Sequence, residues 1–272
     1  MNQNKDIIQQ KHTRLKSLLQ EMGSCLIALS GGVDSVFLMR VAHEVLGQKA
    51  VGVTCDSPSM PREELELAIQ LSKRIGFRHR IVETHEIEQE DYAANPSNRC
   101  YFCRQVMFHT LKKIALEENC PVICDGYNYS DQGDYRPGRQ AAKEHDVRSP
   151  LYEAELTKAE VRVLSHEYGL PNWDRPAAAC LSSRIPYGSR VTVDKLRQIE
   201  ESETYLRSLG LRQVRVRHHG QVARIETDPK EFSLLLTGEN PEKITSRLKE
   251  IGFLFVTLDL LGYRTGSLNE EL

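Results

Sequence analysis

The sequence lacks any run of apolar residues long enough to cross a bilayer, and we expect no signal peptide because its opening residues have no apolar core. It also lacks an excess of charge of either sign: 36 Lys and Arg residues nearly balance 38 Asp and Glu residues, for a formal net charge of −2. A general nucleic-acid-binding protein carries a basic excess, so nucleic acid is not an expected partner. We expect a soluble, cytoplasmic protein that binds no membrane and forms a homo-oligomer.

A disulfide framework is a further expected absence, because the seven cysteines are an odd number in a chain expected to be cytoplasmic. Such a count favours thiol or metal chemistry for some of these cysteines. Cys25 and Cys124 fall in apolar strand patterns, so we expect them to be core residues. Cys120 is given no role, and Cys55, at the end of a predicted strand, is a weak candidate for the site.

The chain has no Walker phosphate-binding loop, since no Gly-rich turn ends in Gly-Lys-Ser or Gly-Lys-Thr. Residues 30–35 instead read S-G-G-V-D-S, between an apolar strand pattern and a helical pattern that begins at Val33. The glycine pair lets the backbone approach a ligand, the helix start adds partial positive charge, and the two serines add hydroxyl donors. This context favours a phosphate-binding loop, although a glycine pair alone would indicate only a structural turn.

Strand and helix patterns alternate over the first part of the chain, which predicts an α/β fold with a parallel, Rossmann-like sheet and helices on both faces. Loops after the carboxyl ends of such strands build the site, and residues 30–35, 55–57 and 125–127 occupy such positions. A capping-box pair, Thr157 and Glu160, predicts the start of a later helix. The strands are predicted at residues 25–29, 50–54, 80–82 and 121–124, after an amphipathic helix that ends near residue 23.

The pattern changes near residue 188, where we place the boundary between a domain at 1–188 and a small α+β domain at 189–272. Arg215 and Arg217 share one face of a predicted strand, because side chains alternate. They could clamp a phosphate or carboxylate, or belong to a solvated, salt-bridged sheet face. The predicted elements are a helix from residue 192 or 194, strands at 214–217 and 221–226 joined by a turn at 218–220, a helix at 241–251 and a strand at 253–258.

Two other stretches contain candidate cysteines. Cys100 and Cys103 form a C-x-x-C pair, which alone could be half of a zinc site, a redox pair or part of an iron–sulfur site. Cys180 lies in a proline-containing stretch that predicts a long, ordered loop. Arg175 and Arg184 flank it and would favour its thiolate, while the alternative is a buried loop cysteine.

Several blocks together resemble one family. The S-G-G-V-D-S loop is similar to the PP-loop of the ATP pyrophosphatase superfamily, whose members cleave ATP between the α and β phosphates. Over essentially the whole chain the sequence resembles the LarE family, through the blocks S-G-G-V-D-S, R-C-Y-F-C-R, R-P-G-R, R-S-P-L, P-A-A-A-C-L-S-S-R-I-P-Y-G and R-V-R-x-H-G. LarE proteins are ATP-dependent sulfurtransferases. They adenylate both carboxylates of pyridinium-3,5-biscarboxylic acid mononucleotide and convert them to thiocarboxylates, for the nickel-pincer nucleotide cofactor of lactate racemase.

This resemblance implies a role for residues of each block. Cys180 corresponds to the family's sulfur-handling cysteine, and Asp34 would hold Mg²⁺ beside the phosphates. The residues expected to bind ATP are Ser30, Gly31, Gly32, Asp34, Ser35 and Gly126. The residues expected to bind the substrate are Arg215 and Arg217, which would hold its phosphate, with Ser183 and Arg184.

The family contains two variants that differ in the source of sulfur. In one variant a single loop cysteine gives up its own sulfur, becomes dehydroalanine and acts once. In the other, three cysteines hold a 4Fe–4S cluster whose unligated iron carries an extra sulfide. Cys100, Cys103 and Cys180 match the three-cysteine pattern, so we expect the cluster variant, with a sulfur donor that the sequence does not identify.

Three other functions compete with this interpretation. A tRNA thiolase also joins a PP-loop to cysteines, but it would need an RNA-binding surface, and this chain offers one Arg/His-rich hairpin. An amide-forming PP-loop ligase would leave three cysteines unexplained. A nucleotide-binding or iron–sulfur sensor would not need activation chemistry. Pyrophosphate release that depends on the pyridinium substrate distinguishes the enzyme from the sensor.

Overall fold

The computed structural model describes residues 2–132, 137–176, 179–264, 266 and 268. Contacts divide the chain into two compact units, Met1–Glu86 with Cys100–Ala178 and Ile87–Arg99 with Ala179–Leu272. The domain boundary expected at residue 188 stays a prediction, and these units place residues 179–188 with the C-terminal part. Arg136 of the R-P-G-R block and residues 177–178 of the Cys180 block lie outside the described residues.

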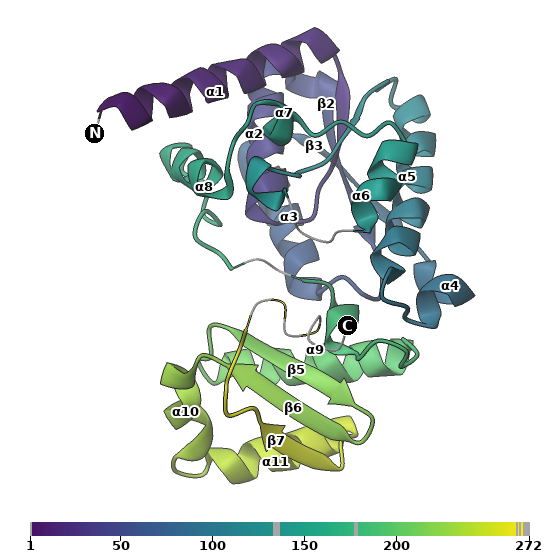
Figure 1. Cartoon of the computed structure of the whole chain (residues 1–272), viewed down its shortest axis with the longest axis vertical. Helices are drawn as coiled ribbons and strands as arrows, with labels where there is room; N and C mark the ends of the chain where they lie inside the picture. The colour runs from purple at the N-terminus through teal and green to yellow at the C-terminus, as the bar shows by residue number, and fades with distance from the viewer. Residues whose placement is uncertain (1, 133–136, 177–178, 265, 267, 269–272) are drawn as a thin grey trace. The chain divides into compact units, whose positions relative to one another are not determined.

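The first unit is built on a four-stranded parallel sheet with the order β3-β2-β1-β4, of which Figure 1 labels β2 and β3. The predicted parallel α/β arrangement is therefore confirmed. β4 is shorter than the predicted strand at 121–124 and begins after Pro121, which has no N–H to donate to a ladder. The strands are β1 Cys25–Ala28, β2 Ala50–Asp56, β3 Arg78–Glu83 and β4 Ile123–Cys124.

Helices cover both faces of this sheet because its central strand is apolar on both sides. Ile27 of β1 packs with helices of one face, while its neighbour Leu26 packs with helices of the other. The first group is α1 Asn2–Met22, α2 Val33–Leu46, α3 Arg62–Ile75, α7 Pro150–Glu153 and α8 Lys158–Glu167. The second group is α5 Arg99–Glu117 and α6 Gly138–Glu144.

The second unit is a small α+β arrangement around a sheet with the order β5-β6-β7. β5 and β6 are antiparallel, and β6 and β7 are parallel. The turn predicted at 218–220 is wrong for His218 and His219, because both pair with β6. The turn consists of Gly220, with φ of +65°, and Gln221, which was predicted to begin the next strand. The elements are α4 Glu90–Ala93, α9 Val193–Ser208, β5 Val214–His219, β6 Val222–Thr227, α10 Phe232–Leu236, α11 Asn240–Ile251 and β7 Phe255–Leu258.

The loops that follow β1, β2 and β4 leave the sheet at the same edge, since these strands are parallel. The S-G-G-V-D-S motif lies in the first of these loops and Gly126 lies in the last. This edge is therefore where the predicted ATP-binding residues gather. None of the described helices combines the length and apolar character that a membrane crossing requires.

Candidate active site

The turn between β1 and α2 depends on glycine. Gly31 has φ of +79°, a region that side-chain-bearing residues rarely adopt, and a Cβ there would lie 2.7 Å from the carbonyl oxygen of Glu64. Ser35 Oγ accepts from the N–H of Ser30 at 3.2 Å and lies 3.2 Å from Ser30 Oγ. The motif thus forms the compact strand–turn–helix that its sequence predicts, with Gly32 as the residue that precedes α2.

The loop after β4 abuts the same turn through Gly126. A Cβ at Gly126 would lie 2.9 Å from the backbone nitrogen of Ser35 and 3.2 Å from its Cα. Only glycine lets the two loops approach this closely. The structure therefore brings Gly126 together with the motif residues Ser30, Gly31, Gly32, Asp34 and Ser35, and their binding of ATP stays a prediction.

A cavity of about 130 Å³ opens beside this turn, lined by residues 30–34 and by Glu64, Lys158, Arg175 and Pro176. The Lys158 ammonium donates to one carboxylate oxygen of Asp34, and the Asn128 amide lies 3.5 Å from the other. Burial raises the pKa of Asp34, and the nearby charge of Lys158 opposes that rise. Asp34 therefore lies at a cavity where its charge is matched by a single lysine.

The donor chemistry around Asp34 fits Mg²⁺ bound together with a nucleotide. Mg²⁺ in phosphate-handling sites takes one or two carboxylates from the protein and completes its shell with phosphate oxygens and water. Asp34 supplies one carboxylate at the wall of the cavity. A cation at this carboxylate would take the place of the Lys158 ammonium.

Sequence reasoning assigned to this site neither the lining residues Lys158 and Arg175 nor Asn172, which contacts its turn. Lys158 occupies the first position of α8, where the helix dipole disfavours a cation, and that mismatch is the signal that could have identified it. Asn172 is buried and donates to the carbonyl of Gly31 at 3.0 Å. Arg175 was expected to favour the Cys180 thiolate, but its guanidinium pairs with two glutamates of α3, Glu63 at 2.8 Å and Glu64 at 2.7 Å.

The three candidate sulfur-handling cysteines belong to different units. Cys100, which is exposed, and Cys103, which is half-buried, lie one turn apart at the start of α5, so their thiols share one side of the helix. Cys180 is exposed and directly precedes a short 3-10 turn at Leu181–Arg184 in the second unit. Within the described part of each unit, no three Cys, His, Asp or Glu side chains are arranged to hold a metal ion. Thiolates are the ligands of iron–sulfur clusters, so the α5 pair fits two positions of such a group.

The other cysteines are unsuited to sulfur chemistry. Burial and, to a smaller extent, the charge of Glu86 raise the pKa of the Cys55 thiol to about 12, so this thiol stays protonated at neutral pH. Cys25 and Cys124 are fully buried on adjacent strands, as predicted for core residues. Cys120 is also buried.

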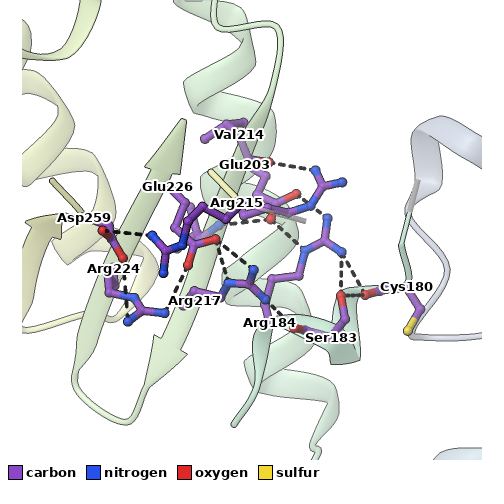
Figure 2. Close-up of polar contacts among 12 residues, drawn as sticks. Cys180, Ser183, Arg184, Glu203, Val214, Arg215, Arg217, Arg224, Glu226 and Asp259 are labelled. Atoms are coloured by element: carbon purple, nitrogen blue, oxygen red, sulfur yellow. Dashed lines mark hydrogen bonds and ion pairs between the residues drawn. The ribbon is translucent and has the colours of Figure 1, made fainter. Parts of the chain in front are cut away.

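Arg184 fixes the turn that follows Cys180 (Figure 2). Its side chain is 1% exposed, and its Nε and Nη2 donate to the two carboxylate oxygens of Glu203 at 2.9 and 3.0 Å. Its Nη1 donates to the carbonyls of Ala179 at 2.7 Å and Cys180 at 2.9 Å, and to Ser183 Oγ at 3.0 Å. Every nitrogen of this guanidinium therefore has a protein acceptor, and the predicted substrate contact of Arg184 stays untested beside this structural role.

Arg215 and Arg217 lie on a buried face of β5, so the solvated sheet face considered from the sequence does not describe them. Arg217 donates to Glu226 at 2.9 and 2.8 Å and to the carbonyl of Ser183 at 2.7 Å. Burial and, to a smaller extent, the charge of Arg184 together lower the pKa of Arg215 to about 10. The structure thus brings Arg215, Arg217, Ser183 and Arg184 together next to the Cys180 turn (Figure 2).

Known proteins with similar sequences include PP-loop enzymes. A family model described as NAD synthase matches residues 7–100, which include the S-G-G-V-D-S turn. The chain is 34% identical over 263 residues to the pyridinium-3,5-bisthiocarboxylic acid mononucleotide synthase of Lactiplantibacillus plantarum, an alignment that covers 96% of this chain and 95% of that protein.

Two further relatives differ in how much of the chain they match. An uncharacterised protein of Synechocystis sp. is 46% identical over 266 residues, which covers 98% of this chain and 99% of that protein. A glutamine-hydrolysing GMP synthase of Aeropyrum pernix is 26% identical over 213 residues, which covers 71% of this chain and 41% of that protein. The alignment with the first of these two therefore spans the sequence of both compact units, and the GMP synthase matches over only part of its length.

Proposed function

Because the chain belongs to the LarE family of PP-loop enzymes, we propose that it is an ATP-dependent sulfurtransferase that converts both carboxylates of pyridinium-3,5-biscarboxylic acid mononucleotide to thiocarboxylates. The product would be the precursor of a nickel-pincer nucleotide. The observation that supports this proposal most directly is that the close contact of Gly31 with Glu64 and the carboxylate of Asp34 lie at one 130 Å³ cavity. Such backbone turns at a helix start are suited to phosphate oxygens.

The first step would be adenylation. A carboxylate oxygen of the substrate attacks the α-phosphorus of ATP, the bond to the β-phosphate oxygen breaks, and pyrophosphate leaves. Ser30, Gly31, Gly32 and Ser35 would hold the departing pyrophosphate, with Gly126 closing the turn behind them. Asp34 would hold Mg²⁺, which supplies charge neutralisation at the phosphates. Lys158, displaced from Asp34, would remain close enough to contact a phosphate oxygen.

The second step would be sulfur transfer. A carboxylate is a poor electrophile, and its adenylate is a good one because AMP is a stable leaving group. A sulfur nucleophile attacks the acyl carbon and expels AMP, which leaves a thiocarboxylate. A 4Fe–4S cluster held by Cys100, Cys103 and Cys180 would supply this sulfur as a sulfide on its fourth iron. The competing source is Cys180 itself, which would lose its sulfur and become dehydroalanine.

The buried arginines of β5 would hold the nucleotide phosphate of the substrate. Arg215 and Arg217 are 8% and 7% exposed and adjoin the turn that carries Cys180. Arg184 is 1% exposed and would act by fixing that turn through Glu203 and backbone carbonyls. The cytoplasmic location, the homo-oligomer and the unidentified sulfur donor are predictions of the same interpretation.

A pyrophosphate-release assay tests the proposal. Purified protein with MgATP should release pyrophosphate only when the pyridinium dicarboxylate mononucleotide is added, and Asp34→Asn should reduce the rate by at least about tenfold. Exposed Asp228, in the second unit, offers a control, since Asp228→Asn should leave the rate unchanged. Pyrophosphate release at the same rate with and without the substrate would contradict the proposal, and so would equal rates for Asp34→Asn and Asp228→Asn.

A further inference from the structure

Two of the blocks that resemble LarE sequences have no role in the function described above. These blocks are R-P-G-R at residues 136–139 and R-S-P-L at residues 148–151. The structure joins them, because Arg139 Nη1 donates to Ser149 Oγ at 2.7 Å. Both residues belong to the first compact unit, close to the loop that follows β4.

The guanidinium of Arg139 is held in one orientation. It lies 4.1 Å from the ring centroid of Tyr127 and 5.7 Å from that of Tyr152. Ser149, which orients Nη1, donates in turn to the buried carboxylate of Asp125 at 2.7 Å. Asp125 also accepts from the backbone N–H of Tyr127 at 3.2 Å, and the Tyr127 hydroxyl donates to the carbonyl of Asp131 at 3.0 Å, which holds the ring on which Arg139 stacks.

This oriented guanidinium has N–H groups that donate to no acceptor among the described residues. A guanidinium has five N–H donors, and Arg139 uses one nitrogen for Ser149. Among the described residues, no acceptor lies within hydrogen-bond distance of its Nε or Nη2. Arg139 is half-buried, so these donors are accessible to a ligand. A fixed, planar fork with two free donor positions matches the two oxygens of a carboxylate.

The neighbours of this cluster connect it to both parts of the proposed chemistry. Gly126, which abuts the backbone of Ser35, directly precedes Tyr127. Gly138, which directly precedes Arg139, is so close to α5 that a Cβ would lie 2.9 Å from Arg104 Cγ and 3.5 Å from the carbonyl of Cys100. The residues that directly precede Tyr127 and Arg139 therefore contact the predicted adenylation turn and the helical turn that carries Cys100, respectively.

We propose that Arg139, stacked on Tyr127 and oriented by Ser149, binds a carboxylate of an aromatic acid substrate. Tyr129 extends the aromatic wall, since its ring is 39% exposed and lies 5.8 Å from that of Tyr152, and it offers a surface for the ring that carries the carboxylate. This assignment rests on the proposed function and names the residues that hold the reacting end of the substrate. It is separate from the phosphate contacts assigned to Arg215 and Arg217.

The test measures binding and turnover in the same variants. Pyridine-3,5-dicarboxylate should bind the wild-type protein in a calorimetric titration, and Arg139→Gln should weaken that binding about tenfold or more. Arg139→Lys should weaken it less than Arg139→Gln, because an ammonium keeps the charge and loses the fork. Arg80→Gln is the matched control, because Arg80 lies on β3 and is paired with Glu117 and Glu118.

The kinetic measurement separates this inference from the proposed function. In pyrophosphate release, Arg139→Gln should raise KM for the pyridinium substrate about tenfold or more and leave KM for ATP unchanged. Absence of substrate-dependent release from the wild type would contradict the proposed function, and the calorimetric result would then decide the role of Arg139 alone. Equal binding by wild type and Arg139→Gln, or no binding by the wild type at millimolar ligand, would overturn the inference. If Arg139→Gln does not fold, Ser149→Ala takes its place with the same expected loss of binding.

Discussion

Arg184 and Glu203 form a buried ion pair within the second unit. Two hydrogen bonds of 2.9 and 3.0 Å join them, and 1% of each side chain is exposed. Glu203 also accepts from the backbone N–H of Val216 at 3.0 Å and from Arg207 at 2.9 Å. One carboxylate on α9 thus ties together the Cys180 turn, strand β5 and its own helix. This relationship makes Glu203 the residue whose loss should disturb the second unit most.

Glu203→Ala should lower the free energy of unfolding by about 3–5 kcal/mol, because it leaves the buried charge of Arg184 without its partner. Urea unfolding followed by circular dichroism measures the change. Glu201 on the same helix is the matched control, since its pair with Arg197 is exposed and Glu201→Ala should change stability by less than about 0.5 kcal/mol. Similar losses in the two variants would contradict the special role of the buried pair.

The same carboxylate should make stability depend on pH. Burial alone would raise the pKa of Glu203, but the charges of Arg184, Arg215 and Arg207 outweigh burial and hold the pKa below its ordinary value of 4.5. A depressed pKa contributes stability above the unfolded value, and that stability disappears as pH falls through the folded value. The stability difference between wild type and Glu203→Gln should therefore be largest near neutral pH and shrink below pH 4.5. A difference that stays constant down to about pH 3 would argue against this linkage.

Gly31→Ala should abolish substrate-dependent pyrophosphate release, because its Cβ would collide with the carbonyl of Glu64 at 2.7 Å. Gly23 provides the comparison, since it also has positive φ, +69°, but no atom lies within 4 Å of a Cβ there. Gly23→Ala should lose only the backbone strain energy of about 1–2 kcal/mol and keep its activity. Activity in both variants would show that the close approach at Gly31 is dispensable.

Lys158→Met should shift the acidic side of the pH–activity profile to higher pH. Burial raises the pKa of Asp34, and Lys158 partly offsets that rise, so removal of the lysine should raise the pKa further. Because Mg²⁺ needs the ionised carboxylate, activity at low pH should be lost earlier in the variant. Values of kcat/KM for MgATP measured across pH test this, because they report the free enzyme, in which Lys158 pairs with Asp34. Lys230→Met, at an exposed lysine of the second unit, is the control. A profile that keeps its acidic limb in place would contradict the pairing of Lys158 with Asp34.

Iron and acid-labile sulfide should be present at nearly four of each per chain, with additional sulfide when sulfur is loaded, after anaerobic reconstitution. Cys100→Ala should lose them, and Cys55→Ala should retain them because the Cys55 thiol, with a pKa of about 12, is a poor ligand. If the wild type binds no iron and becomes lighter by one H₂S after reaction, Cys180 is consumed instead. The chain mass before and after turnover distinguishes these outcomes.

Local patterns in the sequence predicted most of the first unit. The apolar run at 25–29, the S-G-G-V-D-S turn and the capping box of Thr157 and Glu160 each depend on near neighbours, and each appears in the structure. The alternation of strands and helices then required a parallel sheet. The turn at His218 and His219 was mispredicted because polar residues resemble a turn, while pairing with β6 draws both into the strand.

Contacts between distant residues could not be predicted in the same way. Lys158 meets Asp34 across 124 positions, and Arg139 meets Ser149 only because α6 and α7 flank the loop after β4. Arg184 and Glu203 are charged residues in a core, where hydrophobic periodicity assigns neither. These residues become neighbours only when the chain folds. A local sequence pattern can therefore identify a motif such as S-G-G-V-D-S, but it cannot identify the distant residues that contact the motif.

The lysine at Asp34 gives the proposed nucleotide site a counterion of its own. The carboxylate does not stand alone inside the protein before ATP arrives, so the turn can fold without metal. Binding MgATP then becomes an ion exchange, in which the metal replaces the ammonium and a phosphate receives the ammonium in turn. Free Mg²⁺ without a nucleotide would displace the Lys158 ammonium from Asp34 but would supply no phosphate oxygen to accept it. The metal should consequently enter with its nucleotide and bind poorly by itself.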